Sequence, residues 1–249
     1  MKINTDINIL GSLPDWELIK YYYYHKDADL QQGLTHIKTN KSIKRFENAI
    51  KNTFLTFEND KIESLFKPLI SGEANHKDLL LFLFWNASLN NDLFNYLNHN
   101  VFFKALYSGR VSIKNDEVTA CLLELKEKEK QLEKWSMSTV KTTASKYLTL
   151  LKKLGLLEGS RTKNILHPFL DDKMFVIFIY FLTAVETQRN LLNSSWLPYS
   201  FMEKNLFLER LKKKTFIDYY DIYYTGDKLI IEPKIPYRDI YDTLTRNKK

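Results

Sequence analysis

The sequence has few of the residues that build turn-rich or cross-linked folds. Its 249 residues include 7 glycines, 6 prolines and one cysteine, Cys121. Scarce glycine and proline disfavour a sandwich or barrel with many tight turns and favour long helices joined by short links. A single cysteine excludes an intrachain disulfide framework. Hydrophobic residues make up 44% of the chain, so a core can form without cross-links.

The sequence also lacks an apolar run long enough to cross a bilayer. Its most apolar segment, Met174–Val185, has 12 residues, whereas a span takes about 20. We expect this segment to form a buried helix. Residues 1–8 alternate polar and apolar types without a secretory signal. Together with the lone cysteine, these features predict a cytoplasmic protein with no membrane partner.

The net charge is positive but moderate. Lysine and arginine number 37 against 30 aspartate and glutamate residues, which gives a formal charge of +7. This excess suits a nucleic-acid partner or an acidic protein partner and decides neither.

The order of patterns predicts a mainly helical chain in three parts. Residues 1–110 read as a helical bundle, and Tyr107–Arg110 is a plausible boundary. Residues 111–190 contain the segment with the clearest functional signal, together with the buried helix. Residues 191–249 predict a helix and a β-hairpin. No repeat of 20–50 residues is present, which argues against a solenoid.

One helical segment contains no acidic residue. Between Ser138 and Leu154, apolar residues recur at spacings of three and four and mark the inward face. These inward residues are Val140, Ala144, Tyr147, Leu151 and Leu154. The opposite face carries only hydroxyls and cations, namely Ser138, Thr142, Ser145, Lys146, Thr149, Lys152 and Lys153, with Lys141 at its edge.

Such a face suits the phosphates of duplex DNA, because ammonium groups displace condensed counterions and small hydroxyls reach phosphate and base edges. Ser136 or Ser138 can cap the helix, which leaves its first amides free to point at a phosphate. Ser136 and Thr139 are counted with the predicted DNA contacts. The alternative is an ordinary solvent-exposed helix without acidic residues and without a DNA-binding role.

The elements after this helix favour the DNA-binding interpretation. Gly155 ends the helix, Leu156–Glu158 predicts a short strand, and Gly159–Lys163 predicts a basic turn before a return strand at Ile165. This is the layout of a winged helix, with Arg161 and Lys163 at the tip of the wing. Helix–glycine–strand patterns also occur in folds that bind no nucleic acid.

The same residues resemble a known family. Residues 135–140 read W-S-M-S-T-V and residues 150–158 read L-L-K-K-L-G-L-L-E. This pair of motifs is similar to the entry and exit motifs of the BrxA-like family of bacteriophage-exclusion (BREX) defence systems, over about residues 15–190. The resemblance implies a non-catalytic, DNA-binding accessory protein, with other proteins of the defence system as partners. It also implies an N-terminal helical region like the transcription antitermination factor NusB.

A second basic strip lies in the N-terminal part. A predicted helix over residues 41–57 carries an apolar stripe, and its other side is basic. The interpretation of this strip as a supplementary DNA contact is the minority one, because most such sets are simply solvated. Its residues are Lys38, Lys41, Lys44, Arg45 and Lys51.

The C-terminal part predicts a hairpin. Residues 216–224 and 228–232 are rich in β-forming residues and flank Gly226-Asp227, a two-residue turn signal. A helix over Met202–Leu211 ends in three lysines, Lys212–Lys214. Helix, lysines and hairpin could form a second winged helix. Equally, the hairpin could pack on the core.

The sequence shows no convincing catalytic set. Its five histidines lack metal-ligand spacing, and no phosphate loop or nucleophile elbow is present. The weak alternative is a metal-dependent nuclease, since Asp221 and Glu232-Pro233-Lys234 imitate a D…E-x-K set. Pro233 argues against it by removing a strand donor. A structural adaptor without DNA binding is the stronger alternative. We expect no enzyme activity, cofactor or metal; oligomeric state and DNA sequence preference stay open.

Overall fold

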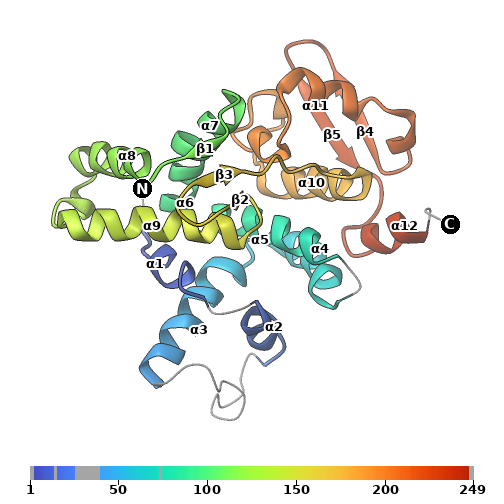
Figure 1. Cartoon of the computed structure of the whole chain (residues 1–249). Coiled ribbons are helices and arrows are strands. Elements are labelled where there is room, and N and C mark those ends of the chain that lie inside the picture. Colours follow the sequence, from blue (N-terminus) through green and yellow to red (C-terminus); the bar gives the residue numbers. More distant parts are fainter. Residues whose placement is uncertain (1–2, 14–15, 26–39, 73–74, 247–249) are drawn as a thin grey trace. The chain divides into compact units, whose positions relative to one another are not determined.

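The computed structural model describes residues 3–13, 16–25, 40–72 and 75–246 (Figure 1). The described residues are mainly helical, with one three-stranded and one two-stranded antiparallel sheet. The predicted mainly helical class is therefore confirmed.

The chain folds as two compact units. Unit 1 comprises residues 1–56 and 80–166, and unit 2 comprises residues 57–79 and 167–249. This grouping differs from a division at residues 110 and 190. The predicted winged-helix segment belongs to the same unit as most of the N-terminal helices, and the segment 57–79 belongs with the C-terminal residues.

Unit 1 contains most of the helices and the three-stranded sheet. Its helices are α1 (Ile7–Leu10), α2 (Glu17–Tyr24), α3 (Asn40–Phe54), most of α5 (His76–Asn90), α6 (Asp92–Leu97), the π-helix η1 (Asn98–Phe102), α7 (Phe103–Tyr107), α8 (Asn115–Lys128), the 3-10 turn η2 (Lys130–Leu132) and α9 (Met137–Lys153). Its strands are β1 (Ser112–Ile113), β2 (Leu157–Glu158) and β3 (Lys163–Ile165).

The helix α3 ends earlier than its apolar stripe predicts. It stops at Phe54, and the backbone beyond is held by Asn86, whose side-chain amide donates to the carbonyls of Phe54 and Thr56 at 2.9 and 3.0 Å. The apolar periodicity alone predicts a helix that continues to Phe57. It cannot show that the buried side-chain amide of a distant helix binds the backbone here.

Unit 2 combines short helices with a hairpin. Its helices are α4 (Asp60–Ile70), α10 (Asp172–Val185), η3 (Leu191–Asn193), η4 (Leu197–Ser200), α11 (Lys204–Leu211), η5 (Lys214–Phe216) and α12 (Ile240–Arg246). Its strands are β4 (Tyr220–Tyr224) and β5 (Leu229–Pro233).

The apolar segment forms the central helix of unit 2. Asp171 caps α10 by accepting from the amide of Met174 at 2.8 Å, and every residue from Met174 to Leu182 is buried. The prediction of a buried helix is confirmed. No helix in the described part of the chain has both the length and the apolar character needed to cross a bilayer.

The C-terminal hairpin has the predicted turn. Tyr224 pairs with Leu229, and the amide of Thr225 donates to the carbonyl of Lys228 across Gly226-Asp227. Leu229 and Ile231 are buried on the face that packs against α10. The Tyr180 hydroxyl of α10 donates to the carbonyl of Tyr219 at 2.6 Å, so the base of the hairpin is hydrogen-bonded to the core of unit 2.

Candidate nucleic-acid interface

The acid-free helix predicted from Ser138 is α9, and Ser136 caps it. The Ser136 hydroxyl accepts from the amide of Thr139 at 3.2 Å and lies 3.0 Å from the Thr139 hydroxyl. Of the two predicted caps, the structure selects Ser136. The helix start is thereby fixed one residue before Ser138, and Ser138 is left exposed.

The inward face of α9 is the predicted one, and a buried hydrogen-bond chain holds it. All five predicted inward residues are at most 1% exposed. The Tyr147 hydroxyl donates to Asn98 Oδ1 at 2.9 Å, and Asn98 Nδ2 donates to the Ser88 hydroxyl at 3.0 Å. Since Asn98 lies on η1 and Ser88 on α5, this chain fixes the rotation of α9 about its axis and so determines which residues face outward.

The outward face is exposed along its first half. Ser138, Lys141, Thr142 and Ser145 are exposed and line a shallow depression of about 520 Å³ together with Met137 and Lys146. Thr149, further along, is half-buried and donates to the carbonyl of Ser145 at 2.8 Å. The helix carries no acidic residue, so its exposed polar groups are hydroxyls and ammonium groups.

Two lysines expected on the exposed outward face of α9 are instead hydrogen-bonded to the N-terminal segment. Lys146 Nζ donates to the Ser12 hydroxyl at 2.6 Å, and Lys153 Nζ donates to the carbonyl of Leu13. Both side chains are half-buried, so the expectation that they are freely exposed is wrong. The physical reason is the packing of α1 against α9.

Gly11 permits this close approach. A Cβ atom at Gly11 would lie 2.6 Å from the backbone oxygen of Lys146 and 2.9 Å from its Cβ, closer than such atoms normally come. The N-terminal segment therefore occupies one edge of α9, and the open part of the outward face is the edge that carries Lys141, Thr142 and Ser145.

The strands beside α9 form a small sheet in the order β1-β3-β2. Leu157 and Glu158 of β2 pair with Ile165 and Asn164 of β3, and the other edge of β3 pairs with β1. The predicted strand, turn and return strand are thus confirmed. The strand β1 was not predicted from the sequence, because two residues give too short an alternation to detect and the partner lies some fifty residues away.

The turn between β2 and β3 is held by lysines. Lys152 Nζ donates to the carbonyl of Gly159 at 2.9 Å, and Lys163 Nζ donates to the carbonyl of Ser160 at 2.8 Å. Burial, followed by the nearby charge of Lys152, lowers the pKa of Lys163. Arg161 at the turn is exposed, as predicted, whereas Lys163 is half-buried at the start of β3. We refer to residues 158–163 as the basic turn.

The supplementary strip on α3 is partly engaged. Lys41, Lys44 and Arg45 are exposed, but Lys51 forms an ion pair with Glu47 at 2.8 Å. Lys38 lies outside the described residues. The strip therefore offers three cations in the described helix.

The D…E-x-K residues come together on the hairpin of unit 2. Asp221 lies directly opposite Glu232, and Lys234 Nζ lies 3.5 Å from Asp221 Oδ1. The same ammonium donates to the carbonyl of Ile217 at 3.0 Å. Pro233 is the last residue of β5. Over the ranges that the structure describes, no group of three or more His, Cys, Asp or Glu residues could hold a metal ion.

A family comparison covers most of these elements. The model of the family described as BrxA matches residues 22–179, which run from the end of α2 through α9 and the basic turn into α10. No curated protein matches the chain significantly. Since the match spans more than half of the 249 residues, the chain belongs to the BrxA family, whose members are components of bacteriophage-exclusion (BREX) phage-defence systems.

Proposed function

We propose that the protein is a non-catalytic component of a BREX defence system that holds duplex DNA through a winged helix. In this proposal α8 and α9 are the helix pair, α9 is the recognition helix, and β2, the basic turn and β3 are the wing. Other proteins of the defence system are its proposed partners. The likeness of the N-terminal helices to NusB stays a prediction from the family resemblance.

The observation that carries the proposal is the combination of one open helix face with one small sheet. The exposed edge of α9 presents Lys141, Thr142 and Ser145 without an acidic neighbour on the helix. The hairpin of β2 and β3 follows α9 directly in the chain, and β3 also pairs with β1, the strand that precedes α8. A helix face and a basic loop of this kind suit a groove and its flanking phosphates.

The predicted contact residues then divide into two groups. Ser138, Lys141, Thr142, Ser145 and Arg161 are exposed and are proposed to touch DNA directly. The others stabilise this surface: Ser136 and Thr139 fix the helix start, Thr149 donates to the backbone of α9, and Lys152 and Lys163 hold the basic turn. Lys146 and Lys153 anchor the N-terminal segment.

A gel-shift titration at several salt concentrations tests the proposal. Lys141→Glu with Arg161→Glu should weaken duplex binding strongly and lower the salt slope by about 1 for each lost phosphate contact. Lys44→Glu with Arg45→Glu on α3 is the matched control, because it replaces one exposed lysine and one exposed arginine in the same unit. Equal binding by the wild type and the Lys141/Arg161 variant would refute the proposed interface. Absence of any binding at low salt would favour an adaptor role.

The proposal also includes the absence of nuclease activity. The D…E-x-K residues offer two carboxylates, and the lysine among them is already engaged with Asp221 and a backbone carbonyl. Incubation of plasmid DNA with the protein and Mg²⁺ or Mn²⁺ should leave the plasmid intact. Cleavage that Glu232→Ala abolishes would show instead that this hairpin is a metal-dependent active site.

A further inference from the structure

The C-terminal unit carries a second cationic surface, beyond the residues that the family model matches. Lys212, Lys213 and Lys214 follow α11, and all three are exposed. A fourth exposed lysine, Lys228, lies beside the turn of the hairpin. The BrxA match ends at residue 179, so these residues lie outside the matched region. We call these four residues the lysine cluster.

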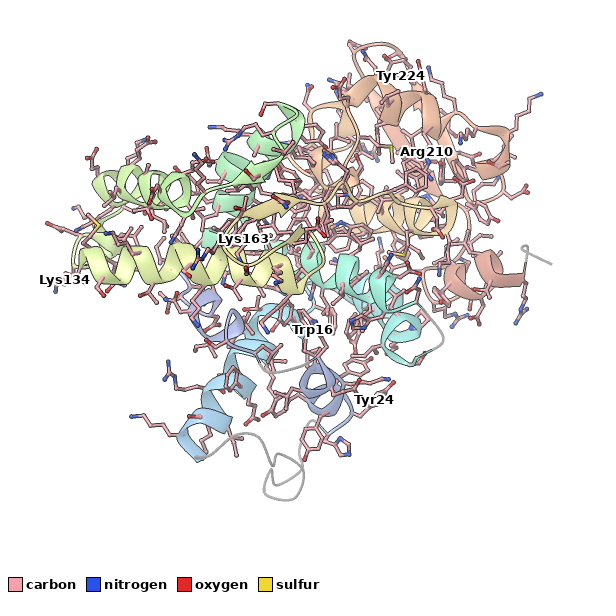
Figure 2. The ribbon with its side chains drawn as sticks, viewed as in Figure 1. Trp16, Tyr24, Lys134, Lys163, Arg210 and Tyr224 are labelled. Atoms are coloured by element: carbon pink, nitrogen blue, oxygen red, sulfur yellow. The ribbon has the colours of Figure 1, made fainter. Side chains whose placement is uncertain are left out.

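One contact joins the run of lysines to the hairpin. Lys212 Nζ lies 4.6 Å from the centre of the Tyr224 ring, close enough for a cation–π interaction. Tyr224 (labelled in Figure 2) is the last residue of β4 before the turn, and it pairs with Leu229, the neighbour of Lys228. The tyrosine is 37% exposed, so its ring is also available to a partner.

Among the described residues, the lysine cluster has no carboxylate partner. None of its four members forms an ion pair within the described part of the chain. The acidic residues nearest in sequence are Glu209, Asp218 and Asp227, and the last of these accepts from the Thr225 hydroxyl at 2.8 Å. In contrast, Lys173 of the same unit forms an ion pair with Asp78 at 2.6 Å.

We propose that the lysine cluster and Tyr224 form a second nucleic-acid contact, which binds the phosphate backbone of DNA. Unpaired ammonium groups on successive residues suit a partner of uniform, closely spaced negative charge, because each ammonium acts as a point charge without a fixed geometry. The exposed tyrosine ring adds an uncharged contact to sugar or base. The inference extends the proposed DNA binding to unit 2, but it does not depend on the α9 interface.

The test compares two pairs of charge reversals within unit 2. Lys213→Glu with Lys228→Glu removes two cations of the cluster and leaves the Lys212–Tyr224 contact in place. Lys67→Glu with Lys77→Glu is the matched control, because both lysines are exposed, lie in the same unit and form no ion pair among the described residues. Both variants change the net charge equally, and circular dichroism and thermal melting check that both are folded.

The measurement is duplex binding against salt concentration, with the full chain and DNA of two unrelated sequences. The cluster variant should lower the salt slope by about 1 per lysine and weaken binding to both sequences alike, while the control keeps the wild-type slope. A wild-type slope for the cluster variant, or an equal loss in the control, overturns the inference and leaves an acidic protein partner as the next explanation to test.

The outcome is separable from that of the winged-helix proposal. If only the Lys141/Arg161 variant loses binding, the second contact is refuted and the α9 interface stands. If only the lysine-cluster variant loses binding, the second contact stands and the α9 interface is refuted.

Discussion

Two sets of lysines, one in each unit, make different contacts. In unit 1, four lysines of α9 and the basic turn donate to the protein itself, for example Lys146 to Ser12 and Lys152 to Gly159. In unit 2, the lysine cluster makes no ion pair with the described residues, and the side chain of Lys212 contacts an aromatic ring. The lysines that donate to the protein therefore contribute to the fold of unit 1, whereas those of the lysine cluster in unit 2 are available to a partner.

The difference teaches that a cationic face in a sequence does not reveal how many of its charges are free. Replacing a polar group that is hydrogen-bonded within the protein should lower the free energy of unfolding. Replacing one without such a bond should weaken ligand binding or have no effect. Four predictions test this division, from the largest expected effect to the smallest.

The largest effect is expected at Tyr147. Tyr147→Phe removes the hydroxyl that donates to Asn98 and leaves Asn98 Oδ1 buried without that donor. The free energy of unfolding should fall by about 1–3 kcal/mol, the usual cost of an unsatisfied buried group. Urea denaturation measures it. Tyr223→Phe, at a tyrosine that is 54% exposed, is the control and should change stability little. Equal stability of the two variants would show that the buried chain does not hold α9.

The next effect concerns the lysines that hold the N-terminal segment. Lys146→Met with Lys153→Met removes two hydrogen bonds to Ser12 and Leu13, each of about 0.5–1.5 kcal/mol, so the melting temperature should fall. Lys213→Met with Lys214→Met should change stability by no more than about 0.5 kcal/mol, since both side chains are exposed. Similar melting temperatures for the two double variants would contradict the contrast between engaged and free lysines.

The sequence predicted elements whose signal is local. The inward residues of α9, the buried helix α10 and the turn at Gly226-Asp227 each follow from periodicity or turn chemistry within about twenty residues, and the structure confirms them. The exposed position of Arg161 follows in the same way from the glycine-flanked turn.

The sequence could not predict features that depend on distant partners. The bonds of Lys146 and Lys153 to Ser12 and Leu13 join residues more than 130 positions apart. Both lysines have the spacing of an outward face, and only the packing of α1 through Gly11 shows that they are covered. The grouping of residues 57–79 with the C-terminal part likewise rests on contacts that no local pattern encodes.

A smaller effect is expected at Arg210, the buried cation of unit 2. Its guanidinium is 4.4 Å from the centre of the Phe175 ring and donates to Asp172 at 2.8 Å, but its Nε and Nη1 atoms are buried without hydrogen-bond partners. Arg210→Met fills similar space without unpaired donors and should be neutral or stabilising by about 1 kcal/mol in chemical denaturation.

The companion variant at Arg210 is Asp172→Ala. It removes the carboxylate and keeps the cation buried, so it should destabilise the protein. If Arg210→Met instead destabilises the protein more than Asp172→Ala, the guanidinium stabilises the fold despite its two unpaired nitrogen atoms.

The smallest effect at neutral pH is expected at Tyr22. Its hydroxyl is buried without a hydrogen-bond partner, so Tyr22→Phe should leave the free energy of unfolding at pH 7 unchanged or raise it slightly. Burial, followed by the negative charge of Glu47, raises the pKa of Tyr22 from 10.0 to about 12. Because the folded pKa lies above the unfolded value, the wild type keeps its stability below pH 10 and loses part of it as the pH rises from 10 to 12. The variant lacks this titration, so urea denaturation at pH 11 should favour the variant over the wild type by more than at pH 7. A difference that is the same at both pH values would mean that the Tyr22 hydroxyl is not shielded from solvent when the protein is folded.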